Sequence, residues 1–122
     1  MKSASAQSST PNPIRTWLSV VVGLCFGALY GWHAAPGIVA FFDDSLEFQV
    51  VLPTFGIGHP TGYPLYTIVG GLWSRLLPLG EWAGRVNLYS ALCAGVAMGF
   101  LCQSALLLAA GRTDAGRARM AL

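Results

Sequence analysis

Two long apolar stretches without charged residues dominate the chain. The first runs from Trp17 to about Phe42, and the second runs from Val86 to about Gly111. Each exceeds the ~20 residues that a helix needs to cross the hydrocarbon core of a bilayer. Because a helix satisfies its own backbone hydrogen bonds in lipid, both stretches are predicted to be transmembrane helices. The pattern therefore predicts an all-α membrane protein in which an outer loop joins two transmembrane helices.

The polar stretch between the spans predicts two short helices. Asp44 and Glu47 have the spacing of a capping box, which predicts a helix over residues 45–52 that stops at Pro53. Residues 65–77 carry apolar side chains at helical spacing but are too few to cross a bilayer. This second segment is expected to be a membrane-surface or re-entrant helix.

These patterns divide the chain into five segments. We expect a disordered cytoplasmic tail at 1–14, a transmembrane helix at 15–42, an outer loop at 43–85, a second transmembrane helix at 86–111 and a cytoplasmic tail at 112–122. The first tail is mostly Ser, Ala, Pro, Asn and Gln, which bury too little apolar surface to fold.

Small residues recur every four positions in both spans. They are Gly23, Gly27 and Gly31 in the first span, and Ala91, Gly95 and Gly99 in the second. A four-residue spacing places small residues on one helix face, where a second helix can approach closely. Glycine is also common in membrane helices without such a role. If the faces do pack, they pack against each other or against other transmembrane helices.

Composition and charge support this topology. The chain has 122 residues, 54% of them hydrophobic, which is more apolar surface than a soluble domain of this size can bury. The segments flanking the spans carry a net charge of +4, and the loop carries −2, within a total of +2. By the positive-inside rule both termini are cytoplasmic and the loop is outside. We expect an integral protein of a bacterial inner membrane, without a nucleic-acid-binding patch.

A cleavable signal peptide is the alternative interpretation of residues 1–36. The region around His33-Ala34-Ala35-Pro36 lacks the small-x-small pattern of a cleavage site, which disfavours it. Cys25, Cys93 and Cys102 all lie within the spans, so no disulfide framework is expected.

Candidate chemistry is concentrated in the loop, which holds four of the five carboxylates. Asp43, Asp44 and Glu47 fall within one helical turn, where a carboxylate could act as a base, bind a cation or hold a hydroxyl group. His59 sits in a Gly- and Pro-rich turn and could donate a proton or bind a phosphate. Arg85 could bind phosphate, pair with an acid or extend to the interface. The same residues also have explanations without a function. The acidic residues could cap a helix or face solvent, His59 could be polar surface, and Arg85 could extend to the membrane interface.

Three motifs together resemble a known family. They are Asp44-Ser45-Leu46-Glu47-Phe48, then Gly56-Ile57-Gly58-His59-Pro60-Thr61-Gly62-Tyr63-Pro64-Leu65-Tyr66, then Arg85-Val86-Asn87-Leu88-Tyr89-Ser90-Ala91-Leu92. In this order and spacing they resemble the N-terminal part of the protein O-mannosyltransferase-like family of polytopic membrane proteins, within the GT-C glycosyltransferase superfamily.

The resemblance implies transfer of a sugar from a polyprenyl-phosphate carrier to an acceptor on the outer face. It implies that Asp44 is the catalytic acidic residue, assisted by Glu47, and that His59, Tyr63, Arg85 and Asp43 bind substrate. The bilayer, the lipid-linked donor and further transmembrane helices are the expected partners. No metal ligand is assigned, and the sequence does not decide whether a divalent metal is required.

The family's proteins have many spans, whereas this sequence predicts two. We therefore expect a fragment or truncated form of a glycosyltransferase that is inactive alone. The alternative is a small non-enzymatic membrane subunit that packs against a larger protein through its small-residue faces.

Overall fold

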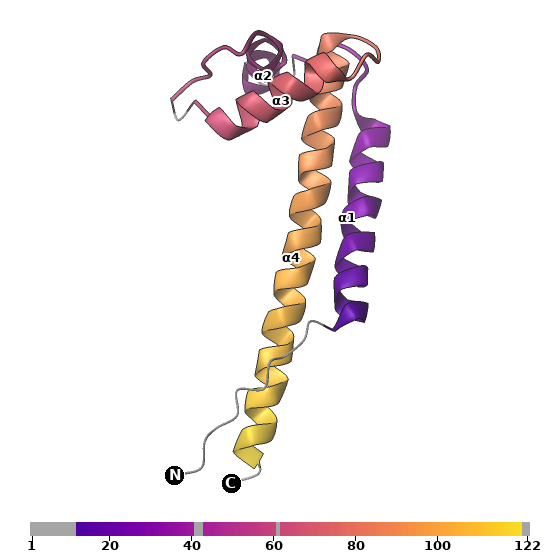
Figure 1. Ribbon diagram of the computed structural model, residues 1–122, viewed down its shortest axis with the longest axis vertical. Coiled ribbons are helices and arrows are strands. Elements are labelled where there is room, and N and C mark those ends of the chain that lie inside the picture. The colour runs from indigo at the N-terminus through magenta and orange to yellow at the C-terminus, as the bar shows by residue number, and fades with distance from the viewer. Residues whose placement is uncertain (1–11, 41–42, 61, 121–122) are drawn as a thin grey trace.

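The computed structural model describes residues 12–40, 43–60 and 62–120, and these residues form helices without a strand. The helices are α1 (Pro13–His33), α2 (Asp43–Thr54), α3 (Pro64–Leu76) and α4 (Trp82–Met120). Figure 1 shows α1 and α4 side by side, with α2 and α3 forming a small head that projects to one side at one end. Both long helices have the length and hydropathy of a membrane span. The predicted all-α architecture, with short helices between two long ones, is confirmed.

The long helices differ from the predicted segments in their ends. Asn12 caps α1, since its side-chain oxygen accepts a hydrogen bond from the Ile14 backbone N–H at 3.0 Å. The helix ends at His33 instead of continuing to residue 42, because Pro36 cannot donate to a helix and biases its predecessor to extended backbone. The expected tail 1–14 lies mostly outside the described residues.

At the other end of the chain, α4 begins at Trp82 and runs on to Met120. Most of the segment predicted as a cytoplasmic tail at 112–122 therefore continues the helix. Its Ala and Arg residues have high helix propensity, and no proline interrupts them.

The two small-residue faces pack against each other within the chain. A methyl group added at Gly95 would lie 2.6 Å from the Cα of Gly27, and one added at Gly23 would lie 3.3 Å from the Cα of Gly99. Beside them, the Ser19 hydroxyl donates to the side-chain oxygen of Gln103 at 2.8 Å. The two faces were predicted to pack against each other or against other transmembrane helices. In this structure they pack against each other, so α1 and α4 cover the paired glycines.

Buried apolar side chains hold the head onto α4. Leu52 of α2 and Val86 of α4 are almost completely buried, and Val51 and Tyr89 join them in one cluster. This cluster fixes α2 against the N-terminal part of α4. It thereby also fixes the acidic residues at the start of α2.

Two side-chain amides attach the segment between α1 and α2 to this head. The Gln49 side chain pairs with both backbone groups of Val39, accepting from its N–H at 3.1 Å and donating to its carbonyl at 3.2 Å. It also donates to the Asn87 side-chain oxygen at 3.3 Å, and Asn87 donates to the carbonyls of Ala35 and Gly37. The described part of this segment, residues 34–40, has no helix or strand of its own, so these amides supply backbone partners for it.

Candidate functional site

The candidate site lies where α2 meets the loop that follows it. Because α2 already begins at Asp43, Asp44 lies in the first turn, and the predicted capping box with Asp44 as N-cap is wrong. The carboxylate of Glu47 is used for a contact with His59 instead. The helix also passes the expected stop at Pro53 and ends one residue later, at Thr54. Asp44 and Glu47, three positions apart, share one face of α2.

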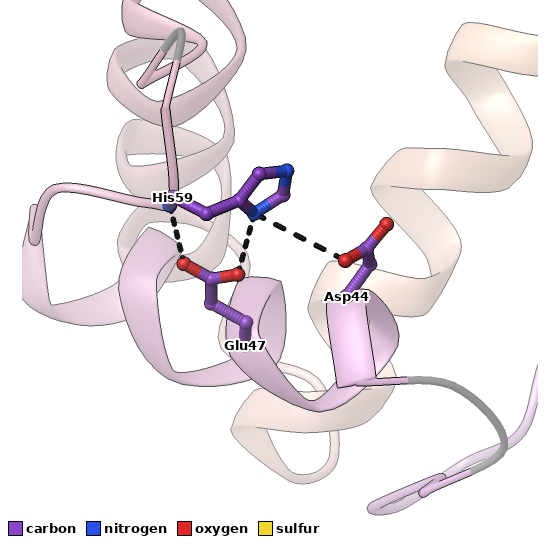
Figure 2. Close-up of side chains that lie close together, drawn as sticks. All are labelled: Asp44, Glu47 and His59. Atoms are coloured by element: carbon purple, nitrogen blue, oxygen red, sulfur yellow. Dashed lines mark hydrogen bonds and ion pairs between the residues drawn. The ribbon is translucent and has the colours of Figure 1, made fainter.

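Glu47 holds His59 through two hydrogen bonds. One carboxylate oxygen accepts from the His59 backbone N–H at 2.6 Å, and the other lies 2.6 Å from the ring Nδ1. The Asp44 carboxylate lies 4.0 Å from the same ring nitrogen. Figure 2 shows both carboxylates directed at the edge of the imidazole that carries Nδ1, while the second ring nitrogen is turned away from Glu47. The structure therefore brings together three of the predicted site residues.

The contact between Glu47 and His59 shifts the pKa of both side chains. The hydrogen bond from His59 lowers the pKa of Glu47, although partial burial opposes the shift. The hydrogen bond to Glu47 raises the pKa of His59, with smaller contributions from the charges of Glu47 and Asp44. Both shifts favour a carboxylate on Glu47 paired with a protonated His59, and the more exposed carboxylate of Asp44 lies beside this pair.

Aromatic packing holds the motif loop in place. The Tyr63 ring stands edge-on to Phe48 at 5.3 Å and to His59 at 5.4 Å between ring centroids. Tyr63 adopts a left-handed backbone (φ 42°), which is uncommon for a bulky residue, and it follows Gly62, which is also left-handed. This double reversal turns the chain from the loop into α3 and places the Tyr63 ring beside His59.

Asp44, Glu47 and His59 also have the residue types of a metal site. Ligand atoms of Asp44, Glu47 and His59 all lie within 4.8 Å of one another, and carboxylate and imidazole groups are suitable ligands for several divalent metals. However, Nδ1 of His59 and the carboxylate of Glu47 are at hydrogen-bond distance, and a bound cation would have to displace the proton between them. We therefore assign no metal ligand.

Arg85 is not brought to this cluster. Its guanidinium donates three hydrogen bonds of 2.9 Å to the carbonyls of Ser74, Leu79 and Gly80, and its Cζ lies 5.2 Å from the centroid of the Trp82 ring. These contacts close the turn between α3 and α4. The side chain of Asp43, the remaining predicted residue, lies outside what the structure describes.

The sequence did not predict the role of Gln49, which lies two residues after Glu47. Its side chain is buried, and its hydrogen bonds to Val39 hold α2 to the segment that precedes it. A single amide among the apolar residues of α2 was the available signal, because a buried polar side chain needs partners. The aromatic support from Phe48 was also missed, since contacts between α2 and the loop follow from the fold and not from spacing.

The fold and site define an integral membrane protein with two long helices and a carboxylate–imidazole cluster in the head that joins them. Residues 44–120 match the family model described as the protein O-mannosyl-transferase TMEM260 N-terminal domain, and the chain belongs to this family. The resemblance predicted from the loop motifs is thereby confirmed.

Two relatives bear out the match over a limited length. The chain is 41% identical over 58 residues to the protein O-mannosyl-transferase TMEM260 of Mus musculus, which is 48% of this chain and 8% of the relative. It is 33% identical over 60 residues to the protein O-mannosyl-transferase tmem260 of Dictyostelium discoideum, 48% of this chain and 7% of the relative. The match thus spans less than a tenth of either relative. No solved structure matches the chain.

Proposed function

We propose that the head carries part of the active site of an integral-membrane glycosyltransferase with the GT-C fold. The observation that carries the proposal is the convergence of Asp44, Glu47 and His59 in a chain of the O-mannosyl-transferase family. The donor is a sugar on a polyprenyl-phosphate carrier, and the acceptor is a hydroxyl group of a protein. Because the match spans less than a tenth of the relatives, we expect the chain to be inactive alone.

Asp44 is the proposed general base. Its side chain is 72% exposed and can reach an incoming acceptor, whereas the carboxylate of Glu47 is already occupied by His59. As the acceptor oxygen bonds to the anomeric carbon of the sugar, its proton passes to Asp44 and the bond from that carbon to the phosphate oxygen breaks. Proton transfer by a positioned carboxylate contributes on the order of 10²–10⁴ to a rate.

His59 is the proposed partner of the departing phosphate. The hydrogen bond to Glu47 raises the pKa of His59 and so favours the imidazolium, and a cation beside a leaving phosphate stabilises the charge that develops on it. Glu47 acts as a positioning residue, because it orients the ring and supports its charge. Tyr63 lines the site, and Asp43 remains a candidate for binding a substrate hydroxyl. The carbonyl contacts of Arg85 favour a structural role over its predicted role at the carrier phosphate.

The charge distribution supports a head on the outer face and termini in the cytoplasm. Both relatives described above are eukaryotic, so a bacterial inner membrane stays a prediction.

A domain exchange tests the proposal. Residues 44–120 replace the matching domain of a full-length relative, and mannosyl transfer is measured in membranes. We expect the exchanged enzyme to be active, and Asp44→Asn to reduce its rate by about 10² or more. Val50→Ala, a change at an exposed position of the same helix, is the control and should leave the rate unchanged. An inactive exchange, or full activity with Asp44→Asn, would overturn the proposal.

A further inference from the structure

Two hydroxyl groups join the start of α3 to α4. The hydroxyl oxygen of Tyr66, in the first turn of α3, lies 2.6 Å from that of Ser90 on α4. The Ser90 hydroxyl also donates to the Val86 carbonyl at 3.0 Å. A hydroxyl group carries a single hydrogen, so Ser90 does not donate to Tyr66 at the same time. In the bond between the two side chains, Tyr66 therefore donates and Ser90 accepts.

This arrangement leaves a hydrogen-bond acceptor open on Tyr66. Both hydroxyl hydrogens are used, whereas the Tyr66 oxygen keeps a lone pair and receives no hydrogen bond from the residues that the structure describes. Burial raises the pKa of Tyr66, so the phenol keeps its proton at neutral pH. A group that binds to this oxygen must consequently bring its own hydrogen, as a hydroxyl group does.

The open oxygen belongs to the same aromatic cluster as the candidate site. The Phe48 ring stands edge-on to Tyr66 at 5.3 Å between ring centroids, and its centroid lies 6.0 Å from that of His59. Phe48 directly follows Glu47 in α2. A single ring therefore separates Tyr66 from His59, which puts a neutral acceptor close to the proposed partner of the departing phosphate.

The surroundings of Tyr66 suit a hydroxyl group better than the phosphate itself. In the described part of the head, both arginines are held at the other end of α3, because Arg75 lies in its last turn and Arg85 donates to the Ser74 carbonyl. Tyr66 has neither an arginine beside it nor a free hydrogen to offer. Phosphate oxygens bind best to charged donors, so His59 is the better match for them.

The pair of hydroxyls lies on the membrane side of the head. Ser90 is exposed on α4, roughly 12 Å along the helix axis from its start at Trp82. Figure 1 shows α3 descending from the end of α4 toward its own N-terminus, so Tyr66 extends from the end of α3 that is closer to the level of the spans. A sugar on a carrier held in the bilayer approaches the head from this side.

We propose that the Tyr66 oxygen accepts a hydrogen bond from one hydroxyl group of the donor sugar and contributes to the choice of that sugar. The inference rests on the proposed sugar transfer and adds a residue that contacts the sugar itself. A site that hydrogen-bonds a substrate hydroxyl discriminates against an analogue that lacks it. Ser90 is a positioning residue, because it holds the Tyr66 hydrogen away from the ligand.

Donors that lack one hydroxyl group test this contact in the exchanged enzyme that carries residues 44–120. Polyprenyl-phosphate-linked mannose and its 2-, 3-, 4- and 6-deoxy forms are supplied in turn, and kcat/KM is measured for each. Tyr66→Phe removes the acceptor oxygen and keeps the ring that packs on Phe48. Ser90→Ala is the matched control, since it breaks the same 2.6 Å contact and leaves the Tyr66 oxygen in place.

We expect one deoxy donor to lose roughly 2- to 13-fold in kcat/KM, the ratio that corresponds to one neutral hydrogen bond. Tyr66→Phe should abolish this difference between the donors, and Ser90→Ala should retain it. Three results would overturn the inference, because each indicates a structural role: an unchanged difference in Tyr66→Phe, equal effects of the two variants, or complete loss of transfer in Tyr66→Phe.

Failure of this inference is distinguishable from failure of the proposed function. An exchanged enzyme without any activity would remove the proposed sugar transfer and this inference with it. An active exchanged enzyme whose selectivity among the donors does not depend on Tyr66 would remove the inference only.

Discussion

Glu47 accepts two hydrogen bonds of 2.6 Å from His59, twelve residues farther along the chain. One comes from the backbone N–H and the other involves the ring Nδ1, so a single carboxylate sets both the path of the loop and the orientation of the imidazole. The second ring nitrogen is turned away from Glu47 (Figure 2). Because both bonds are local to the head, their removal can be studied without an assay of sugar transfer.

Glu47→Gln should lower the pKa of His59 toward its ordinary value, because the neutral amide no longer stabilises the imidazolium. NMR titration of the His59 ring signals measures this pKa. Asp44→Asn is the matched control, and its effect should be smaller because that carboxylate is 4.0 Å from the ring. An equal or larger shift from Asp44→Asn would show that the two carboxylates are assigned the wrong roles.

The contribution of this ion pair to stability should depend on pH. The raised pKa of His59 gives a contribution that is complete below the ordinary histidine pKa of about 6.5 and is lost as the pH rises through the folded-state value. The lowered pKa of Glu47 gives a contribution that is complete above the ordinary glutamate pKa of about 4.3 and is lost as the pH falls through the folded-state value.

The difference in melting temperature between the unsubstituted chain and Glu47→Gln should therefore be largest between about pH 4.3 and pH 6.5. Thermal unfolding in detergent micelles over a range of pH measures it. A difference that does not change with pH would indicate that the paired charges contribute nothing to stability.

Gly95→Leu should separate α1 from α4, because any side chain at this position meets the Gly27 backbone. Overpacking of this kind costs roughly 1–3 kcal/mol, and the free energy of unfolding in mixed micelles measures the loss. Gly111→Leu on the same helix is the control, since a methyl group added there meets nothing within 4 Å. Equal effects of the two substitutions would contradict packing through the glycine faces.

Gln49→Leu should release the segment between α1 and α2. The substitution removes the partners of the partly buried Val39 N–H and carbonyl, and losing a hydrogen bond costs about 0.5–1.5 kcal/mol. We expect a lower melting temperature and faster protease cleavage within residues 34–40. Thr54→Val, which removes an exposed hydroxyl bonded only within α2, should change neither. Unchanged cleavage of Gln49→Leu would mean that the amide does not hold this segment.

Much of the fold follows from the sequence because its signals are local. Two uncharged stretches of sufficient length predict the spans, and residues 65–77 predict α3 to within one residue at each end. The ends of the other helices were harder to predict. Asp44 and Glu47 have capping spacing, but that spacing does not reveal that His59 competes for the Glu47 carboxylate.

The sequence by itself determined the membrane class, the family and the residue types available for chemistry, because length, hydropathy and motif order can be read along the chain. Only the tertiary structure decided which of those residues meet. It paired Glu47 with His59 and committed Arg85 to backbone carbonyls. It also turned the small face of α3 inward and its leucines outward. The physical reason is that several groups could bind the same hydrogen-bond partner, and either face of a helix could pack inward. Which of them does so depends on how segments that are distant in the sequence pack together.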